Sequence, residues 1–145
     1  ADAKGNGVMT VTLESAPAPK TTTTKAFHIE TADETEASKK ADAQAAVNEL
    51  AKRLNGKTVP TTATPAAADG KYADTDTQVI TDIKTALDGL NSTNVIKDLD
   101  VTKVTPSIKY ADKVADGINY TITLTFEYET GKTVTAESKL VRIEK

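Results

Sequence analysis

Hydrophobic and polar residues alternate with a period of two in some segments of the chain and follow a helical period in others. The most regular segment is 118–128, where every second residue is apolar or aromatic and the residues between are Thr, Asn or Glu. This period places alternate side chains on opposite faces of a strand. Residues 129–132 form a polar turn, and residues 133–143 return with similar alternation. We therefore expect a long antiparallel hairpin with one buried and one solvated face.

A second hairpin is expected near the start of the sequence, from strands at 8–13 and 21–30 on either side of the Pro-containing segment 16–19. Proline interrupts a strand because it lacks a backbone donor. Alternation directs the apolar side chains of this hairpin toward a core and leaves His28 and Glu30 on the outer face. The expected inward residues are Met9, Val11, Leu13, Phe27 and Ile29.

Two helices are expected between the hairpins, and the first covers 34–54. Thr31 and Glu34 fit a capping box at its start. Gly56 supplies the left-handed conformation that commonly follows a helix end. The apolar stripe of this helix consists of Ala43, Val47, Leu50 and Leu54.

The second helix covers 76–90, with Thr75 or Asp76 as its N-cap. Its apolar stripe consists of Val79, Ile83, Leu87 and Leu90. Residues 57–75, between the two helices, contain two Pro, a Gly and few large apolar side chains, so we expect a long surface loop there.

The segment after the second helix is expected to be extended over 95–104. Its alternation slips between Val101 and Val104, which indicates a bulge or a sheet edge. Pro106 then interrupts the pattern, and residues 108–110 are expected to form a further short strand.

These elements predict an α+β fold: an antiparallel sheet built from two β-hairpins, with two amphipathic helices packed on one face. We expect a single domain over 1–145. The two hairpins have similar patterns, since residues 10–14 resemble residues 123–127. This likeness fits either two similar hairpins or a pseudo-repeat with its boundary in the Thr-, Pro- and Ala-rich loop 57–75.

Composition removes several kinds of chemistry. The sequence contains no Cys, which excludes disulfides, thiolate nucleophiles and Cys-ligated metal sites. His28 is the only His, and no nucleophile or orienting acid stands at a spacing typical of a catalytic motif. We therefore expect no enzymatic activity, no catalytic residues and no cofactor-binding residues.

Charge and hydropathy narrow the range of partners. A net charge of −3 with only two Arg does not favour binding to nucleic-acid phosphates. No apolar run is long enough to span a bilayer as a helix. We expect a protein partner, with no nucleic acid and no membrane insertion.

Short acidic spacings leave Ca²⁺ as the one metal to consider. The first places to look are Asp112, Asp116 and either Asp98 or Asp100. None of these spacings reproduces the EF-hand loop, and turns and helix caps use Asp equally well. We therefore expect no metal site, with Ca²⁺ as the alternative.

Threonine is the most informative excess in the composition, with 25 Thr and 21 Ala among 145 residues. Threonine suits a solvated strand face, but a row of Thr side chains also offers a surface for a partner. We take this face of the C-terminal hairpin as the candidate protein interface, and pairing at sheet edges as a second route to self-association. The candidate interface residues are Thr121, Thr123, Thr125, Thr133 and Thr135.

The sequence resembles domains of bacterial surface-layer and related cell-surface proteins. The resemblance rests on the excess of Thr, Ala and Lys, the absence of Cys and Trp, and strands such as residues 120–125 and 131–135. It implies an extracellular, non-enzymatic structural or interaction protein that self-assembles or docks at a bacterial cell surface. The alternatives are a virion or phage-type structural module, and a small domain that binds a glycan or another ligand through the 57–75 loop.

Overall fold

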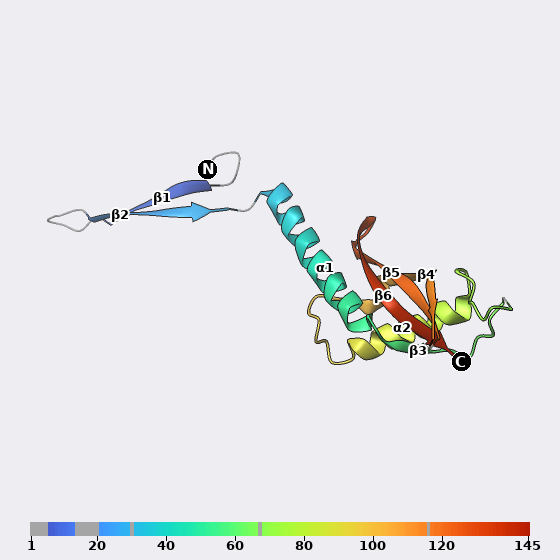
Figure 1. Cartoon of the computed structure of the whole chain (residues 1–145). Coiled ribbons are helices and arrows are strands. Elements are labelled where there is room, and N and C mark those ends of the chain that lie inside the picture. Colours follow the sequence, from blue (N-terminus) through green and yellow to red (C-terminus); the bar gives the residue numbers. More distant parts are fainter. Residues whose placement is uncertain (1–5, 14–20, 30, 67, 116) are drawn as a thin grey trace. The chain divides into compact units, whose positions relative to one another are not determined.

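The computed structural model describes residues 6–13, 21–29, 31–66, 68–115 and 117–145 (Figure 1). The described part of the chain is α+β, with two α-helices, a two-stranded sheet and a four-stranded sheet. Contacts divide the chain into two compact units, Ala1–Lys39 and Lys40–Lys145, with the division inside helix α1 (Ala32–Leu54). The pseudo-repeat boundary expected at 57–75 stays a prediction.

The first unit contains an antiparallel pair, β1 (Asn6–Leu13) and β2 (Thr21–His28). The two strands form a sheet of their own, so the expectation that this hairpin joins the other one in a single sheet is wrong. Met9 and Ile29, expected to face a core, are 54% and 58% exposed. Two strands provide no second layer to cover an apolar face. The side chains of Val11 and Leu13 lie outside the described residues.

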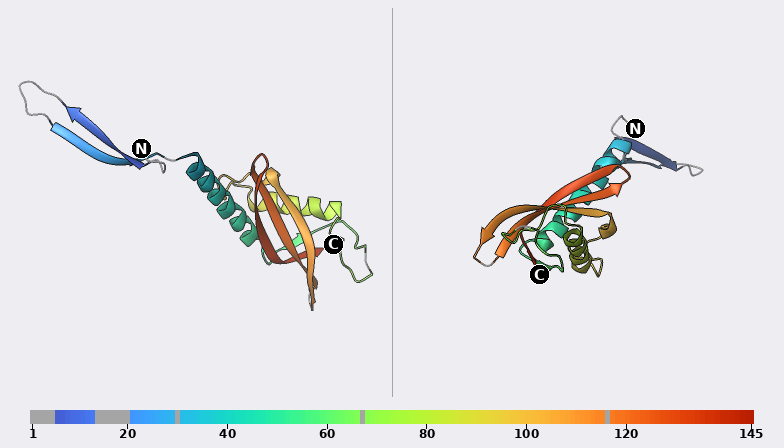
Figure 2. Two further views of the ribbon diagram at one scale, coloured as in Figure 1. Left: turned by 90° about the horizontal axis from the view of Figure 1, so that it is seen from above. Right: turned by 90° about the vertical axis from the view of Figure 1, so that its right-hand side faces the viewer.

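The second unit contains the four-stranded sheet. Its strands lie in the order β3-β6-β5-β4, and β3 runs parallel to β6 while the other pairs are antiparallel. The strands are β3 (Thr58–Pro60), β4 (Val104–Val114), β5 (Gly117–Glu129) and β6 (Lys132–Glu144). The sheet is therefore mixed rather than purely antiparallel, and the neighbours of the C-terminal hairpin are β3 and β4. Figure 2 shows β4, β5 and β6 as a twisted ribbon with α2 on one side.

Helix α1 begins at Ala32, two residues before the expected start, and the N–H of Thr35 donates to the carbonyl of Thr31 (2.9 Å). The side chain of Glu34, and with it the proposed capping box, lies outside the described residues. The predicted stripe of Ala43, Val47, Leu50 and Leu54 is buried. Gly56 follows with φ +72°, the left-handed value that favours Gly after a helix.

Helix α2 (Thr77–Leu90) follows the prediction closely. Asp76 is its N-cap, and its carboxylate accepts from the N–H groups of Gln78 (3.0 Å) and Val79 (3.1 Å). This satisfies two donors that have no partner within the helix. Three of the four stripe residues, Val79, Ile83 and Leu87, are wholly buried, while Leu90 is partly buried.

Two segments between these elements differ from expectation. The 57–75 loop contains β3, where Val59 is buried and Pro60 stands in an edge strand that needs fewer donors. The segment expected to be extended over 95–104 is not a strand before its last residue: residues 95–103 form turns and a short 3₁₀ helix, η1 (Val101–Lys103), and β4 begins at Val104. The slip in alternation marks this 3₁₀ turn, and the bulge lies later, between Tyr110 and Asp112.

The hydrophobic core of the second unit draws on both helices and on one face of the sheet. Four alternate residues of β5, Tyr120, Ile122, Leu124 and Phe126, are buried as the two-residue period predicts. The Tyr120 hydroxyl lies at the end of this row and accepts from the N–H of Tyr72 (2.9 Å), which fixes residues 69–72 against the sheet. The inner face is therefore closed by the core, and the outer face of the sheet points away from it.

Candidate interaction surface

The outer face of β4, β5 and β6 is polar. On the central strand β5, Thr121, Thr123 and Thr125 are half-buried between their neighbouring strands, while Thr133 and Thr135 on β6 are exposed. The structure brings Thr125 and Thr135 together as direct cross-strand partners. Thr133 lies opposite Glu127 instead of a Thr. The five predicted residues therefore share one face, along two adjacent strands.

Strand β4 adds residues that the sequence analysis did not include. Thr105 pairs with Thr125, Ser107 with Thr123 and Lys109 with Thr121, and all three β4 side chains are exposed. The sequence did contain a signal for these three residues, because they alternate with the buried residues of β4. It was missed because Pro106 was taken as an interruption, although an edge strand tolerates Pro.

A row of three Thr side chains crosses the sheet at this point: Thr105 on β4, Thr125 on β5 and Thr135 on β6. Neighbouring side chains in such a row are about 5 Å apart, so their methyl groups and hydroxyls form one continuous surface. We call this row, with Ser107, Thr121, Thr123 and Thr133, the Thr face. It presents hydroxyl donors and acceptors, with charged side chains beside it on the same face: Lys109 opposite Thr121, Glu137 opposite Thr123 and Glu127 opposite Thr133.

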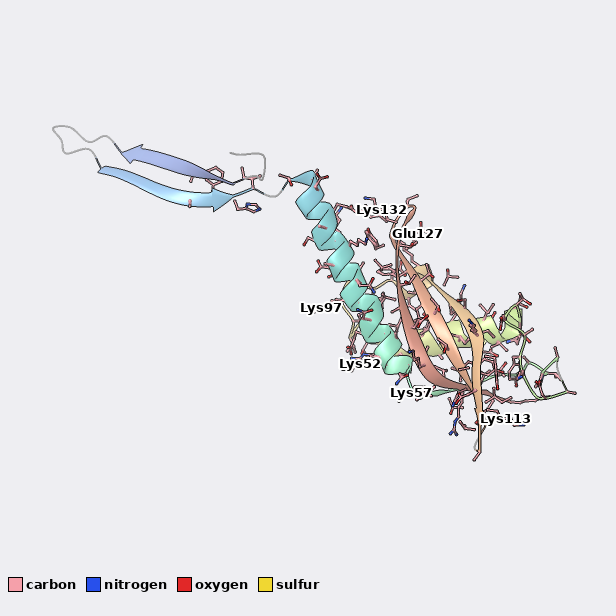
Figure 3. The ribbon with its side chains drawn as sticks, turned by 45° about the horizontal axis from the view of Figure 1, so that its top comes forward. Lys52, Lys57, Lys97, Lys113, Glu127 and Lys132 are labelled. Atoms are coloured by element: carbon pink, nitrogen blue, oxygen red, sulfur yellow. The ribbon has the colours of Figure 1, made fainter. Side chains whose placement is uncertain are left out.

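The edge of the sheet at β6 is closed to an incoming strand. The Gln44 amide of α1 donates to the Thr135 carbonyl (2.7 Å), and the Asn55 side chain accepts from the N–H of Lys139 (3.1 Å). Further along β6, the N–H of Arg142 donates to the Lys57 carbonyl (2.9 Å), at the start of the pairing with β3. Figure 3 shows α1 running alongside β6, with Lys57 labelled where α1 leads into β3.

The opposite edge, at β4, pairs only with β5 among the described strands. It is 11 residues long and carries Pro106, Lys109 and Lys113. Proline and Lys are residues that natural proteins use to limit pairing at an exposed edge. Figure 3 labels Lys113 at the end of the sheet opposite Glu127 and Lys132.

A shallow hollow of about 990 Å³ lies in the loop after α2, and three of its lining residues are Asp88, Asp98 and Asp100. The loop is built around Asn91, whose side-chain oxygen accepts from the N–H of Ile96 (2.8 Å). Asp100 caps η1 by accepting from the N–H and the hydroxyl of Thr102, at 3.0 and 2.6 Å. These hydrogen bonds hold the pKa of Asp100 below its ordinary value. The carboxylate of Asp100 therefore shapes the turn.

The structure does not assemble the residues considered for Ca²⁺. Asp98 and Asp100 precede β4, and Asp112 lies near its far end, about 25 Å away at the rise of an extended strand. Asp116 lies outside the described residues. Within the described ranges, no three His, Asp or Glu side chains lie close enough to hold a metal ion. His28 is exposed at the end of β2.

Other ionisable side chains in the second unit are used in tertiary contacts. Lys71 forms an ion pair with Asp69 (2.8 Å) and lies 4.1 Å from the centre of the Tyr110 ring. This contact lowers the pKa of Asp69 and raises the pKa of Lys71. Burial raises the pKa of Tyr120, whose hydroxyl accepts from Tyr72. The shifts of Asp69 and Lys71 arise from their ion pair, and that of Tyr120 arises from its burial on β5.

Neither of the described helices is long and apolar enough to cross a membrane. Comparison with protein-family models, curated proteins and solved structures finds no match.

Proposed function

We propose that the chain is a non-enzymatic structural or interaction module that self-assembles or docks onto another protein through the Thr face, at a bacterial cell surface. The observation that carries the proposal is the row Thr105–Thr125–Thr135, which crosses three strands on the solvent side of the sheet. A hydroxyl-rich row that spans three strands, with Lys109, Glu127 and Glu137 at its borders, suits contact with another polar surface. The proposed location rests on the compositional resemblance to surface-layer domains.

The contacts within the second unit support a structural role for its ionisable side chains. The carboxylates of Asp69, Asp82 and Asp100 are engaged by Lys71, Gln78 and Thr102 respectively. The 57–75 segment favours the proposed interaction module over the alternative, a domain that binds a ligand through this loop. Its residues Val59, Thr61 and Ala63 are buried against the core, which leaves less of the segment free to close over a ligand.

Light scattering after size-exclusion chromatography tests the proposal, with the chain at several concentrations and with or without Ca²⁺. We expect the mean mass to rise with concentration and not to depend on Ca²⁺. Thr125→Lys places a longer, charged side chain in the centre of the Thr face, and desolvating its ammonium at an interface weakens association by at least about tenfold.

Thr85→Lys is the matched control, because Thr85 is also an exposed Thr but lies on α2. It should leave the association constant unchanged. A strictly monomeric mass under every condition would contradict self-assembly. Equal association of both variants would place the interface away from the Thr face.

A further inference from the structure

The two hairpins of the chain have equivalent sequences at their open ends. Strand β2 leads into Phe27-His28-Ile29-Glu30, and β6 ends in Val141-Arg142-Ile143-Glu144. In their partner strands, Asn6-Gly7 and Asn119-Tyr120 begin the pairing. Each ending alternates apolar and polar residues in the same order, with an aliphatic or aromatic residue first.

The registers of the two hairpins agree at these positions. Asn6 pairs with His28 and Asn119 pairs with Arg142, so an Asn faces a basic residue in both. The next pair is Gly7 with Phe27 in one hairpin, and it is Tyr120 with Val141 in the other. Phe27 therefore occupies the place of Val141. Beyond these two pairs the hairpins differ, because the β5–β6 register shifts between Tyr120 and Ile122 and again between Glu127 and Glu129, whereas the β1–β2 register is continuous.

The equivalent positions are less buried in the first hairpin: Phe27 is partly buried, whereas Val141 is wholly buried. Val141 and Ile143 are 0% and 5% exposed, in the core beneath the helices. Ile29, which corresponds to Ile143, is 58% exposed, and Met9 on β1 is 54% exposed. An isolated pair of strands is marginally stable in water, and it becomes stable when its apolar face gains a covering layer.

We infer that β1–β2 is a second example of the β5–β6 hairpin, and that its apolar face binds a helix-bearing layer like the one formed by α1, β3, α2 and β4. The proposed partner is therefore another α+β layer of this kind, one that is not already covered by its own hairpin. A complete second unit does not qualify, because its own β5–β6 already fills that layer. The inference concerns a surface separate from the Thr face, so it stands or fails independently of the proposed function.

A fused chain tests the inference. A copy of residues 32–114, which form the layer from α1 to β4, is joined to the chain before residue 1. The added layer is then followed by the β1–β2 hairpin, just as the original layer is followed by the β5–β6 hairpin. Hydrogen exchange followed by NMR then reports the protection of the β1 and β2 amides. We expect their protection factors to rise by at least about a hundredfold over the unfused chain.

Two variants of the fused chain distinguish a specific layer from general crowding. Phe27→Asp, at the position equivalent to buried Val141, should remove the gain in protection. His28→Asp, at the position equivalent to Arg142, should keep it. Both variants leave the complete unit Lys40–Lys145 unchanged, so its own amides report whether the protein remains folded.

Three results would overturn the inference. The first is a fused chain in which β1–β2 gains no protection. The second is an unfused chain in which β1–β2 is already as protected as β5–β6 at low concentration, because the hairpin is then covered within the chain. The third is protection in the unfused chain that rises with concentration and is lost in Phe27→Asp, because the occupant is then another copy of the hairpin.

Discussion

The two helices of this chain are stabilised in different ways. Helix α2 has 14 residues, an Asp76 cap and a stripe of apolar side chains that is buried along its length. Helix α1 has 23 residues, but none of its described side chains before Ala43 is buried. Tertiary packing supplies most of the stability of a helix in a protein. The comparison therefore separates α1 into a first part that depends on local propensity and a second part that belongs to the core.

The largest expected effect tests the core part of α1. Leu50 is 0% exposed, so Leu50→Ala removes buried methyl groups and leaves a cavity. We expect the free energy of unfolding to fall by about 2–5 kcal/mol, measured by urea denaturation. The matched change in the first part is Ala37→Gly at an exposed position.

Ala37→Gly lowers helix propensity by about 1 kcal/mol, which should appear as lost helical signal and not as a lower urea midpoint. A midpoint that falls as far as in Leu50→Ala would mean that the first part of α1 is packed as firmly as the second.

An intermediate effect is expected at the start of α2. Asp76→Ala leaves the N–H groups of Gln78 and Val79 without their side-chain acceptor. We expect a loss of about 0.5–2 kcal/mol in the urea unfolding of the second unit. Asp88→Ala, an exposed Asp near the other end of the same helix, is the control and should change stability by less than about 0.5 kcal/mol. Similar losses in both variants would contradict the capping role.

The smallest effect concerns acid stability and Asp82 of α2. The Thr61 side chain makes the largest contribution to lowering the pKa of Asp82. Gln78, whose side-chain amide donates to Asp82 at 2.9 Å, lowers this pKa further. A carboxyl whose folded pKa lies below its unfolded value stabilises the protein above that unfolded value, near 3.8. The contribution is lost as pH falls through the folded pKa.

Asp82→Asn should therefore flatten the dependence of the urea midpoint on pH below about pH 4, relative to the parent chain. An unaltered acid slope in Asp82→Asn would show that folding does not lower the pKa of Asp82 in solution.

The sequence predicts the elements with strong periodicity well. The alternation of 118–128 gave β5 and its buried face, and the spacing of Val79, Ile83 and Leu87 gave α2. These patterns succeed because each residue reports on its own burial. What covers the face of a strand is not a local property, so the sheet order and the separation of β1–β2 from it were not predictable.

The candidate surface was predicted in part for the same reason. Thr121, Thr123 and Thr125 share a face by simple alternation, and that much follows from the sequence. The row that includes Thr105 depends on the register between β4 and β5, which is set by the core residues of both strands. β3 was missed because three residues, one of them Pro60, are too short for a periodic signal.

The closure of the β6 edge by Gln44 and Asn55 has a consequence for the geometry of assembly. With that edge closed and β3 only three residues long, the sheet has one extendable side, at β4. Objects with a single complementary side form closed pairs, whereas objects with two form open-ended filaments. Strand addition between copies of this unit therefore stops at two. An array of this unit larger than a pair then needs a further contact, and the Thr face, at right angles to the strand edge, is the surface proposed for it.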